Sequence, residues 1–145
     1  MDERIKEHLK RLNRYYLQLV DIRQVSYEDF VNNEINRAAA ERVLQIAIES
    51  CLNIGNRLIS LLQFEKSVRT PESYADIFVI MRNLNIIDSA FLDRLVEMAK
   101  FRNRLVHLYW EMDSEVTYRI LHENIDDLKK FQEVVVDFLN KRSAE

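Results

Sequence analysis

Residues 2–24 read DERIKEHLKRLNRYYLQLVDIRQ, and this stretch decides the fold class. Its apolar residues recur at alternating steps of four and three positions: Ile5, Leu9, Leu12, Tyr16 and Leu19. Because this spacing follows the turn of a helix, all of them lie on one stripe of an amphipathic helix. The other positions carry several basic residues, but Asp2, Glu3 and Glu7 lie among them, so we interpret this face as an ordinary solvated surface and not as a track for phosphates.

The composition extends this prediction to the whole chain. Glycine and proline occur once each in 145 residues, of which 48% are hydrophobic and 31% are charged. So few turn-forming residues argue against a β-sandwich or a doubly wound sheet. We therefore expect an all-α protein, an antiparallel bundle of about five to six helices, in one domain that spans residues 1–145.

Capping residues indicate where the N-terminal helices begin and end. Ser26, followed by Glu28 and Asp29, resembles a capping box and predicts a new helix near residue 27. A second apolar stripe then runs to about Phe64, with possible weak points near Asn32 and at Gly55. Its members are Ile35, Ala39, Val43, Ile46, Ile54, Leu58 and Leu61.

Four further residues predict the boundaries in the C-terminal half. The only proline, Pro71, follows a threonine and predicts a helix that starts there. Asp88 and Asp113 are placed to cap two later helices, and Asn124 predicts a break before the last one.

Charge and cysteine content limit the possible functions. A formal net charge of −3 provides no general attraction for nucleic acid, so any RNA contact must be local. Cys51 is the only cysteine, and no cluster of His, Cys and carboxylate residues has the spacing of metal ligands. The sequence shows neither a signal peptide nor an apolar run of about 18 residues. We expect a cytoplasmic protein with no membrane association, no metal and no cofactor.

The residues that point to chemistry are RNRLVHLY, residues 102–109. They place Arg102, His107 and Tyr109 in the spacing R-x4-H-x-Y. A guanidinium binds phosphate, an imidazole transfers protons near neutral pH, and a tyrosine offers a stacking surface or a modifiable hydroxyl. The pattern predicts a site that binds or cuts a phosphodiester. The alternative is that Arg102 and His107 are surface or capping groups, because cations are favourable near a helix C-terminus.

Helix geometry separates the two principal residues of this motif. On an ideal helix His107 lies about 140° around the axis from Arg102, whereas Asn103 and His107 share a face. Asn103 could therefore hydrogen-bond His107 and fix its tautomer. Convergence of Arg102 and His107 needs either local unwinding or a second chain, and a two-fold dimer would supply both residues twice. We predict a homodimer.

Two segments resemble a known family. They are FRNRLVHLYW, residues 101–110, and ERVLQIAIE, residues 41–49. Both are similar to the HepT-like toxins of the HEPN superfamily. The resemblance implies a helical-bundle, metal-independent ribonuclease toxin that acts as a homodimer, with the motif of both subunits lining a shared cleft. It also implies a partner, an MNT-type nucleotidyltransferase antitoxin that can transfer AMP onto a motif tyrosine.

The resemblance also implies a role for each motif residue. Arg102 would contact the scissile phosphate, and His107 would act as the general base. Tyr109 would accept AMP, which would block the cleft to RNA.

The remaining candidates lie within the motif or shortly before it. Asn103 would orient it, and Arg104 and Lys100 would add positive charge toward the RNA substrate. Tyr109 and Trp110 could instead be core or dimer-interface aromatics, and Glu49 a solvated or paired helix residue. Two other functions stay open. The first is an inactive module that binds nucleotide or serves as the helical partner subunit of a nucleotidyltransferase. The second is a dimeric scaffold without a site.

Overall fold

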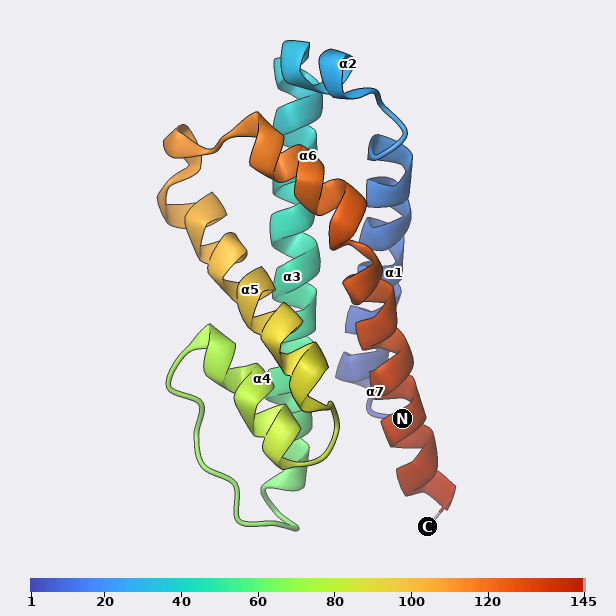
Figure 1. The fold of residues 1–145 in the computed structure, drawn as a ribbon. Coiled ribbons are helices and arrows are strands. Elements are labelled where there is room, and N and C mark those ends of the chain that lie inside the picture. Colours follow the sequence, from blue (N-terminus) through green and yellow to red (C-terminus); the bar gives the residue numbers. More distant parts are fainter. Residues whose placement is uncertain (145) are drawn as a thin grey trace.

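The computed structural model describes residues 1–144, and within them every side chain except that of Tyr109. This part of the chain contains no strand, which confirms the all-α prediction (Figure 1). Its elements are α1 (Glu3–Ile22), α2 (Tyr27–Asn32), α3 (Glu34–Leu62), α4 (Tyr74–Asn83), α5 (Ser89–His107), the short 3-10 helix η1 (Tyr109–Glu111), α6 (Ser114–Glu123) and α7 (Asp126–Ala144).

The long helix α3 is the centre of the bundle. It packs against each of the other α-helices, with its most extensive contact on α1. In Figure 1 the chain ascends in α1, descends in α3, ascends in α5 and descends in α7, so the long helices alternate in direction as predicted. The α4 helix lies against α3 and α5, near the start of α5.

Most helix boundaries follow from capping side chains. The side-chain oxygens of Ser26, Asp88 and Asp113 accept backbone N–H groups at 3.2, 2.7 and 2.8 Å, which satisfies donors that a helix start leaves unpaired. Asn33 separates α2 from α3, and Asn124 follows the last residue of α6 as its C-cap. These predictions are confirmed.

Gly55 does not interrupt α3, although it was a possible weak point. It lies where α4 crosses α3, and a Cβ at this position would come within 2.5 Å of the Ile77 side chain and 3.1 Å of the Met81 sulfur. The glycine therefore permits close packing of the two helices.

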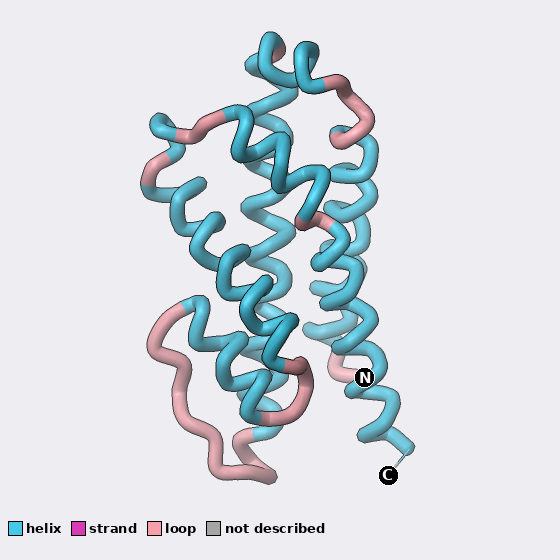
Figure 2. The backbone as a smooth tube through the Cα atoms, viewed as in Figure 1, coloured by secondary structure: helices cyan, strands magenta, loops and turns pink. Residues whose placement is uncertain are grey.

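The predicted helix start at Pro71 is wrong. The α4 helix begins at Tyr74, and the Ser73 hydroxyl caps it by accepting the N–H of Asp76 at 3.1 Å. The Asp76 carboxylate also accepts the N–H of Glu72 at 2.9 Å and pairs with Arg69. These contacts hold the preceding residues in the connection between α3 and α4, drawn as a loop in Figure 2.

The predicted face of α3 is wrong in its first half. Ile35 is 80% exposed and Ala39 is exposed, whereas Ile54 and Leu58 are buried as expected. The buried residues of the first half are Ala40, Leu44, Ala47 and Ile48. The buried stripe is shifted by one position from the predicted one, because the helices that pack against α3 decide which of its faces is covered.

None of the helices in residues 1–144 combines the length and apolar character that a membrane-spanning segment requires.

Candidate functional site

The R-x4-H-x-Y motif spans the C-terminal end of α5. His107 is the last residue of the helix, and the N–H of Leu108 donates to the carbonyl of Arg104 at 2.8 Å. The backbone of Tyr109 begins η1, so the tyrosine belongs to the next element. Its side chain, the predicted acceptor of AMP, lies outside the described residues.

Arg102 is held by Glu49 of α3. Its Nε and Nη2 atoms donate to Oε1 of Glu49 at 3.1 and 2.9 Å, and Nε2 of Gln45 donates to the same oxygen at 3.0 Å. The Arg102 side chain is only 13% exposed and that of Glu49 is 30% exposed. The guanidinium is therefore fixed between two helices instead of moving freely in solvent.

Two further contacts complete the surroundings of Arg102. The ring of Tyr74 covers the guanidinium, with its centre 4.7 Å from Cζ, and Nη1 donates to Oδ1 of Asn103 at 3.2 Å. An arginine carries five N–H donors. Three are used by Glu49 and Asn103, so two remain without a partner among the described residues.

Asn103 and His107 line an open groove with a volume of about 670 Å³. We call it the motif groove, and its other lining residues are Asn56, Thr70, Pro71, Glu72, Ser73, Tyr74 and Ile77. His107 is exposed there. The two motif residues share a face as predicted, but the side-chain oxygen of Asn103 accepts from Arg102, and no described residue hydrogen-bonds the His107 ring.

Arg102 does not line the motif groove itself. It lies behind two of the residues that do, Tyr74 and Asn103. The structure thus brings Arg102 next to the groove that contains His107 but does not align the two side chains on one surface, in keeping with their angular separation on the helix.

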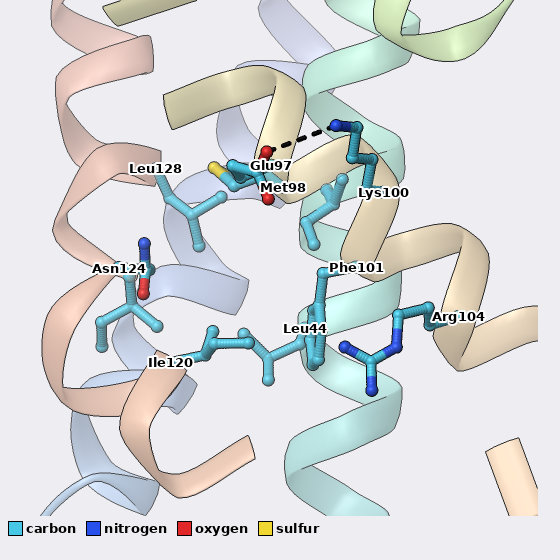
Figure 3. Close-up of a pocket in the computed structure, with 11 residues that line it drawn as sticks. Leu44, Glu97, Met98, Lys100, Phe101, Arg104, Ile120, Asn124 and Leu128 are labelled. Carbon is cyan, nitrogen blue, oxygen red and sulfur yellow. Dashed lines mark hydrogen bonds and ion pairs between the residues drawn. The ribbon is translucent and has the colours of Figure 1, made fainter. Parts of the chain in front are cut away.

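Lys100 and Arg104 lie elsewhere on α5. They line a second cavity of about 430 Å³, which we call the apolar cavity (Figure 3). Nζ of Lys100 lies 3.4 Å from Oε1 of Glu97 in an exposed ion pair. The described structure does not bring either cation into the motif groove.

Glu49 and Tyr74 are the residues that the sequence interpretation missed. Glu49 is paired, which was one of its expected states, but nothing in the local sequence identified Arg102 as the partner. One signal in the sequence could have indicated that Glu49 lies near a site. Glu49 and Asn56 are polar, seven positions apart, and lie on one face of an otherwise largely buried helix.

Other titratable groups lie apart from the motif. Cys51 is fully buried, and this burial raises the pKa of its thiol. Partial burial lowers the pKa of His8 on α1, and Nδ1 of His122 lies 2.8 Å from the carbonyl of Tyr118. In residues 1–144, no three His, Cys, Asp or Glu side chains form a group able to hold a metal ion.

The fold and the site define a class: a helical-bundle protein with a fixed arginine and an exposed histidine at the end of one helix. The family model described as "Ribonuclease HepT-like" matches residues 5–135. The chain belongs to this HepT-like family.

Two curated relatives share this similarity. The mRNA nuclease HepT of Shewanella oneidensis is 26% identical over 92 residues, which cover 63% of this chain and 66%, just under two thirds, of that protein. The tRNA nuclease HepT of Aphanizomenon flos-aquae is 25% identical over 109 residues, which cover 75% of this chain and 71% of that protein.

Solved structures show the same fold. The tri-AMPylated Shewanella oneidensis HEPN toxin in complex with its MNT antitoxin has a TM-score of 0.85 at 21% identity, over 94% of this chain and 99% of that one. The Bacillus subtilis cytosolic protein YutE has a TM-score of 0.79 at 25% identity, over 94% of this chain and 91% of that one.

Proposed function

We propose that this protein is a cytoplasmic, metal-independent endoribonuclease toxin, neutralised by an MNT-type nucleotidyltransferase antitoxin. The observation that carries the proposal is the fixed guanidinium of Arg102 next to the groove that exposes His107. Family membership and the nuclease names of the relatives support it.

Arg102 binds the scissile phosphate in this proposal. Glu49 accepts two hydrogen bonds from one edge of the guanidinium and fixes its orientation. The two remaining N–H donors are therefore already oriented to donate to phosphate oxygens. As negative charge builds on those oxygens during attack, a preorganised cation stabilises it more than a mobile one would. Glu49 is thus a positioning residue.

His107 transfers the proton. As general base it takes the proton of an RNA 2'-hydroxyl, whose oxygen attacks the adjacent phosphorus. The bond between the 2'-oxygen and phosphorus forms while the bond to the 5'-oxygen breaks. A protonated histidine of the second copy protonates the leaving oxygen. The products are a cyclic phosphate and a 5'-hydroxyl end.

A second copy completes the site. Arg102 and His107 of one chain do not share a surface, whereas a two-fold arrangement supplies each residue twice. Leu108 and Trp110, one and three residues after His107, are 40% and 66% exposed, and such apolar side chains are suited to burial against a partner. Asn103, which lines the motif groove, then orients or contacts the RNA, whereas Lys100 and Arg104 line the other cavity of α5.

AMP transfer to Tyr109 is the proposed switch. The phenolic oxygen attacks the α-phosphorus of ATP, pyrophosphate leaves and the phenolic proton is lost. The new phosphate adds negative charge and bulk at a position two residues after His107 in the chain, which would repel and obstruct RNA.

The test compares two exposed histidines. Purified wild type should degrade RNA in the presence of EDTA, and His107→Gln should lose about 10²- to 10⁴-fold in cleavage rate. His122→Gln is the matched control and should retain the wild-type rate, because His122 does not line the motif groove. Equal rates for wild type and His107→Gln would refute the proposal, and loss of wild-type cleavage in EDTA would refute metal independence.

The main alternative is an inactive nucleotide-binding module or partner subunit, which the net charge of −3 favours because it attracts RNA weakly. Nucleotide binding without RNA cleavage would select it.

A further inference from the structure

The apolar cavity exists because α5 and α7 diverge. The α5 helix packs on α3 and α4, whereas α6 and α7 pack on α1 and α3. An ion pair between Arg94 and Asp127 joins α5 to the start of α7, and in Figure 1 α5 then leans away toward its C-terminal end. The hollow lies above α3, between α5 on one side and α6 with the start of α7 on the other, and Arg102 does not line it.

The walls of this cavity are apolar and belong to the core. They consist mainly of Leu44, Ile48, Met98, Phe101, Ile120, Ile125 and Leu128, all buried except the half-buried Ile120, and the half-buried amide of Asn124 is the polar side chain among them. The volume of about 430 Å³ falls within the range of sites that bind small molecules, roughly 300–1,000 Å³. Walls of this kind favour an apolar body over a base or a sugar, because they offer few hydrogen-bonding groups.

The mouth of the cavity carries net positive charge. Glu97, Lys100 and Arg104 are exposed there, and the carboxylate of Glu97 pairs with Lys100. Arg104 has no ion pair or hydrogen-bond partner for its guanidinium among the described residues. In Figure 3 the Arg104 side chain extends toward the cavity, whereas Lys100 turns toward Glu97. One guanidinium is therefore available at the edge of an apolar hollow.

We propose that the apolar cavity binds a small amphipathic carboxylate, with its hydrocarbon body between α5 and α7 and its charged group on Arg104. The apolar walls bind the body through removal of its surface from water. Arg104 supplies the charge complementarity that distinguishes an acid from a neutral molecule of the same shape. This site is separate from the motif groove and does not depend on ribonuclease activity.

Calorimetric titration of the purified protein with hexanoate, octanoate and octanol tests both the apolar walls and the role of Arg104. Octanoate should bind about tenfold more tightly than hexanoate, because two more methylene groups are buried. Octanol should bind several-fold more weakly than octanoate. Absence of saturable octanoate binding would overturn the proposal, and so would an equal affinity for the acid and the alcohol.

Variants locate the site. Arg104→Gln should weaken octanoate several-fold and leave octanol unchanged, whereas Arg119→Gln, the same change at an exposed arginine of α6 outside the cavity, should alter neither. Ile120→Trp should fill the cavity and weaken both ligands. Circular dichroism checks that each variant is folded. Equal affinities for Arg104→Gln and Arg119→Gln would contradict the role of Arg104, and unchanged binding to folded Ile120→Trp would place the ligand elsewhere.

Discussion

Two arginines of α5 make the same kind of contact in different surroundings. Arg94 donates from Nε to both oxygens of Asp127 at 2.8 and 2.9 Å and from Nη2 to the carbonyl of Glu123 at 3.1 Å. Arg102 donates from Nε and Nη2 to Glu49 at 3.1 and 2.9 Å. Each pair joins α5 to another helix, α7 in the first case and α3 in the second.

The difference lies in what surrounds each guanidinium. The Arg94 side chain is 50% exposed and lines neither the motif groove nor the apolar cavity, and its buried partner Asp127 is 9% exposed. The Arg102 side chain is 13% exposed and contacts Tyr74 and Asn103, which line the groove with His107. An arginine–carboxylate pair by itself therefore indicates only that two helices are joined. The residues around the guanidinium show whether the arginine also belongs to a functional site.

The largest expected effect separates the two arginines by activity. Arg102→Gln should lower the single-turnover rate of RNA cleavage by about 100- to 1,000-fold, because the developing charge loses a preorganised donor. Arg94→Gln, the matched control, should stay within about threefold of wild type. Comparable losses in both variants would show that the two pairs serve only the fold.

The second prediction concerns stability. Arg94→Gln should lower the free energy of unfolding by about 1–3 kcal/mol in urea titrations, because it leaves the buried carboxylate of Asp127 without its cation. Adding Asp127→Asn should recover part of the loss. A double variant as unstable as the sum of the two single ones would mean that the pair contributes no coupling.

The third prediction tests Glu49 as a positioning residue. Glu49→Gln keeps the size of the side chain but weakens its hold on Arg102, so cleavage should slow about tenfold through loss of orientation. RNA affinity, measured in a His107→Gln background, should change much less. Glu41→Gln, on the same helix and without a contact to Arg102, should behave as wild type. Faster cleavage by Glu49→Gln would indicate that Glu49 restrains Arg102 instead of positioning it.

The smallest expected effect concerns Asp126, which links α7 to α1 next to Asp127. A hydrogen bond from the Tyr16 hydroxyl at 2.8 Å, with help from Arg23, holds the pKa of Asp126 below its ordinary value. The carboxylate of Asp126 therefore binds a proton more readily in the unfolded chain than in the folded one. The stabilisation is full above about pH 4, the ordinary range of an aspartate, and is lost as the pH falls through the lower folded value.

Asp126→Asn should therefore reduce the free energy of unfolding slightly near pH 6, and the difference from wild type should shrink below about pH 4. Urea titrations at both pH values measure it. A difference that grows on acidification would contradict the assignment. The effect is small because the Asp126 side chain is 69% exposed and water screens its interactions.

Local sequence predicted the features that depend on neighbours in the chain. Ser26, Asp88 and Asp113 cap helices because each side chain reaches backbone donors two or three residues later. The motif lies at a helix end, and Asn103 shares a groove with His107, because four positions make about one helical turn. These relations are determined within a few residues.

Tertiary packing decided the rest. The first half of α3 buries a stripe one position away from the predicted one because the helices packed against α3 decide which face is covered. Lys100 and Arg104 line the apolar cavity because α5 and α7 diverge there. Arg102 and Glu49 meet although 53 residues separate them. No local pattern encodes such a pair, because it forms only where two folded helices cross.

The sequence by itself thus determined an all-α chain and a motif with Arg102 and His107 on different sides of one helix end. Only the tertiary structure decided that Glu49 fixes the arginine, that Tyr74 covers it and that the histidine faces an open groove. The physical reason is range: helix periodicity and capping act over one or two turns, whereas a site is assembled from side chains that only packing brings together.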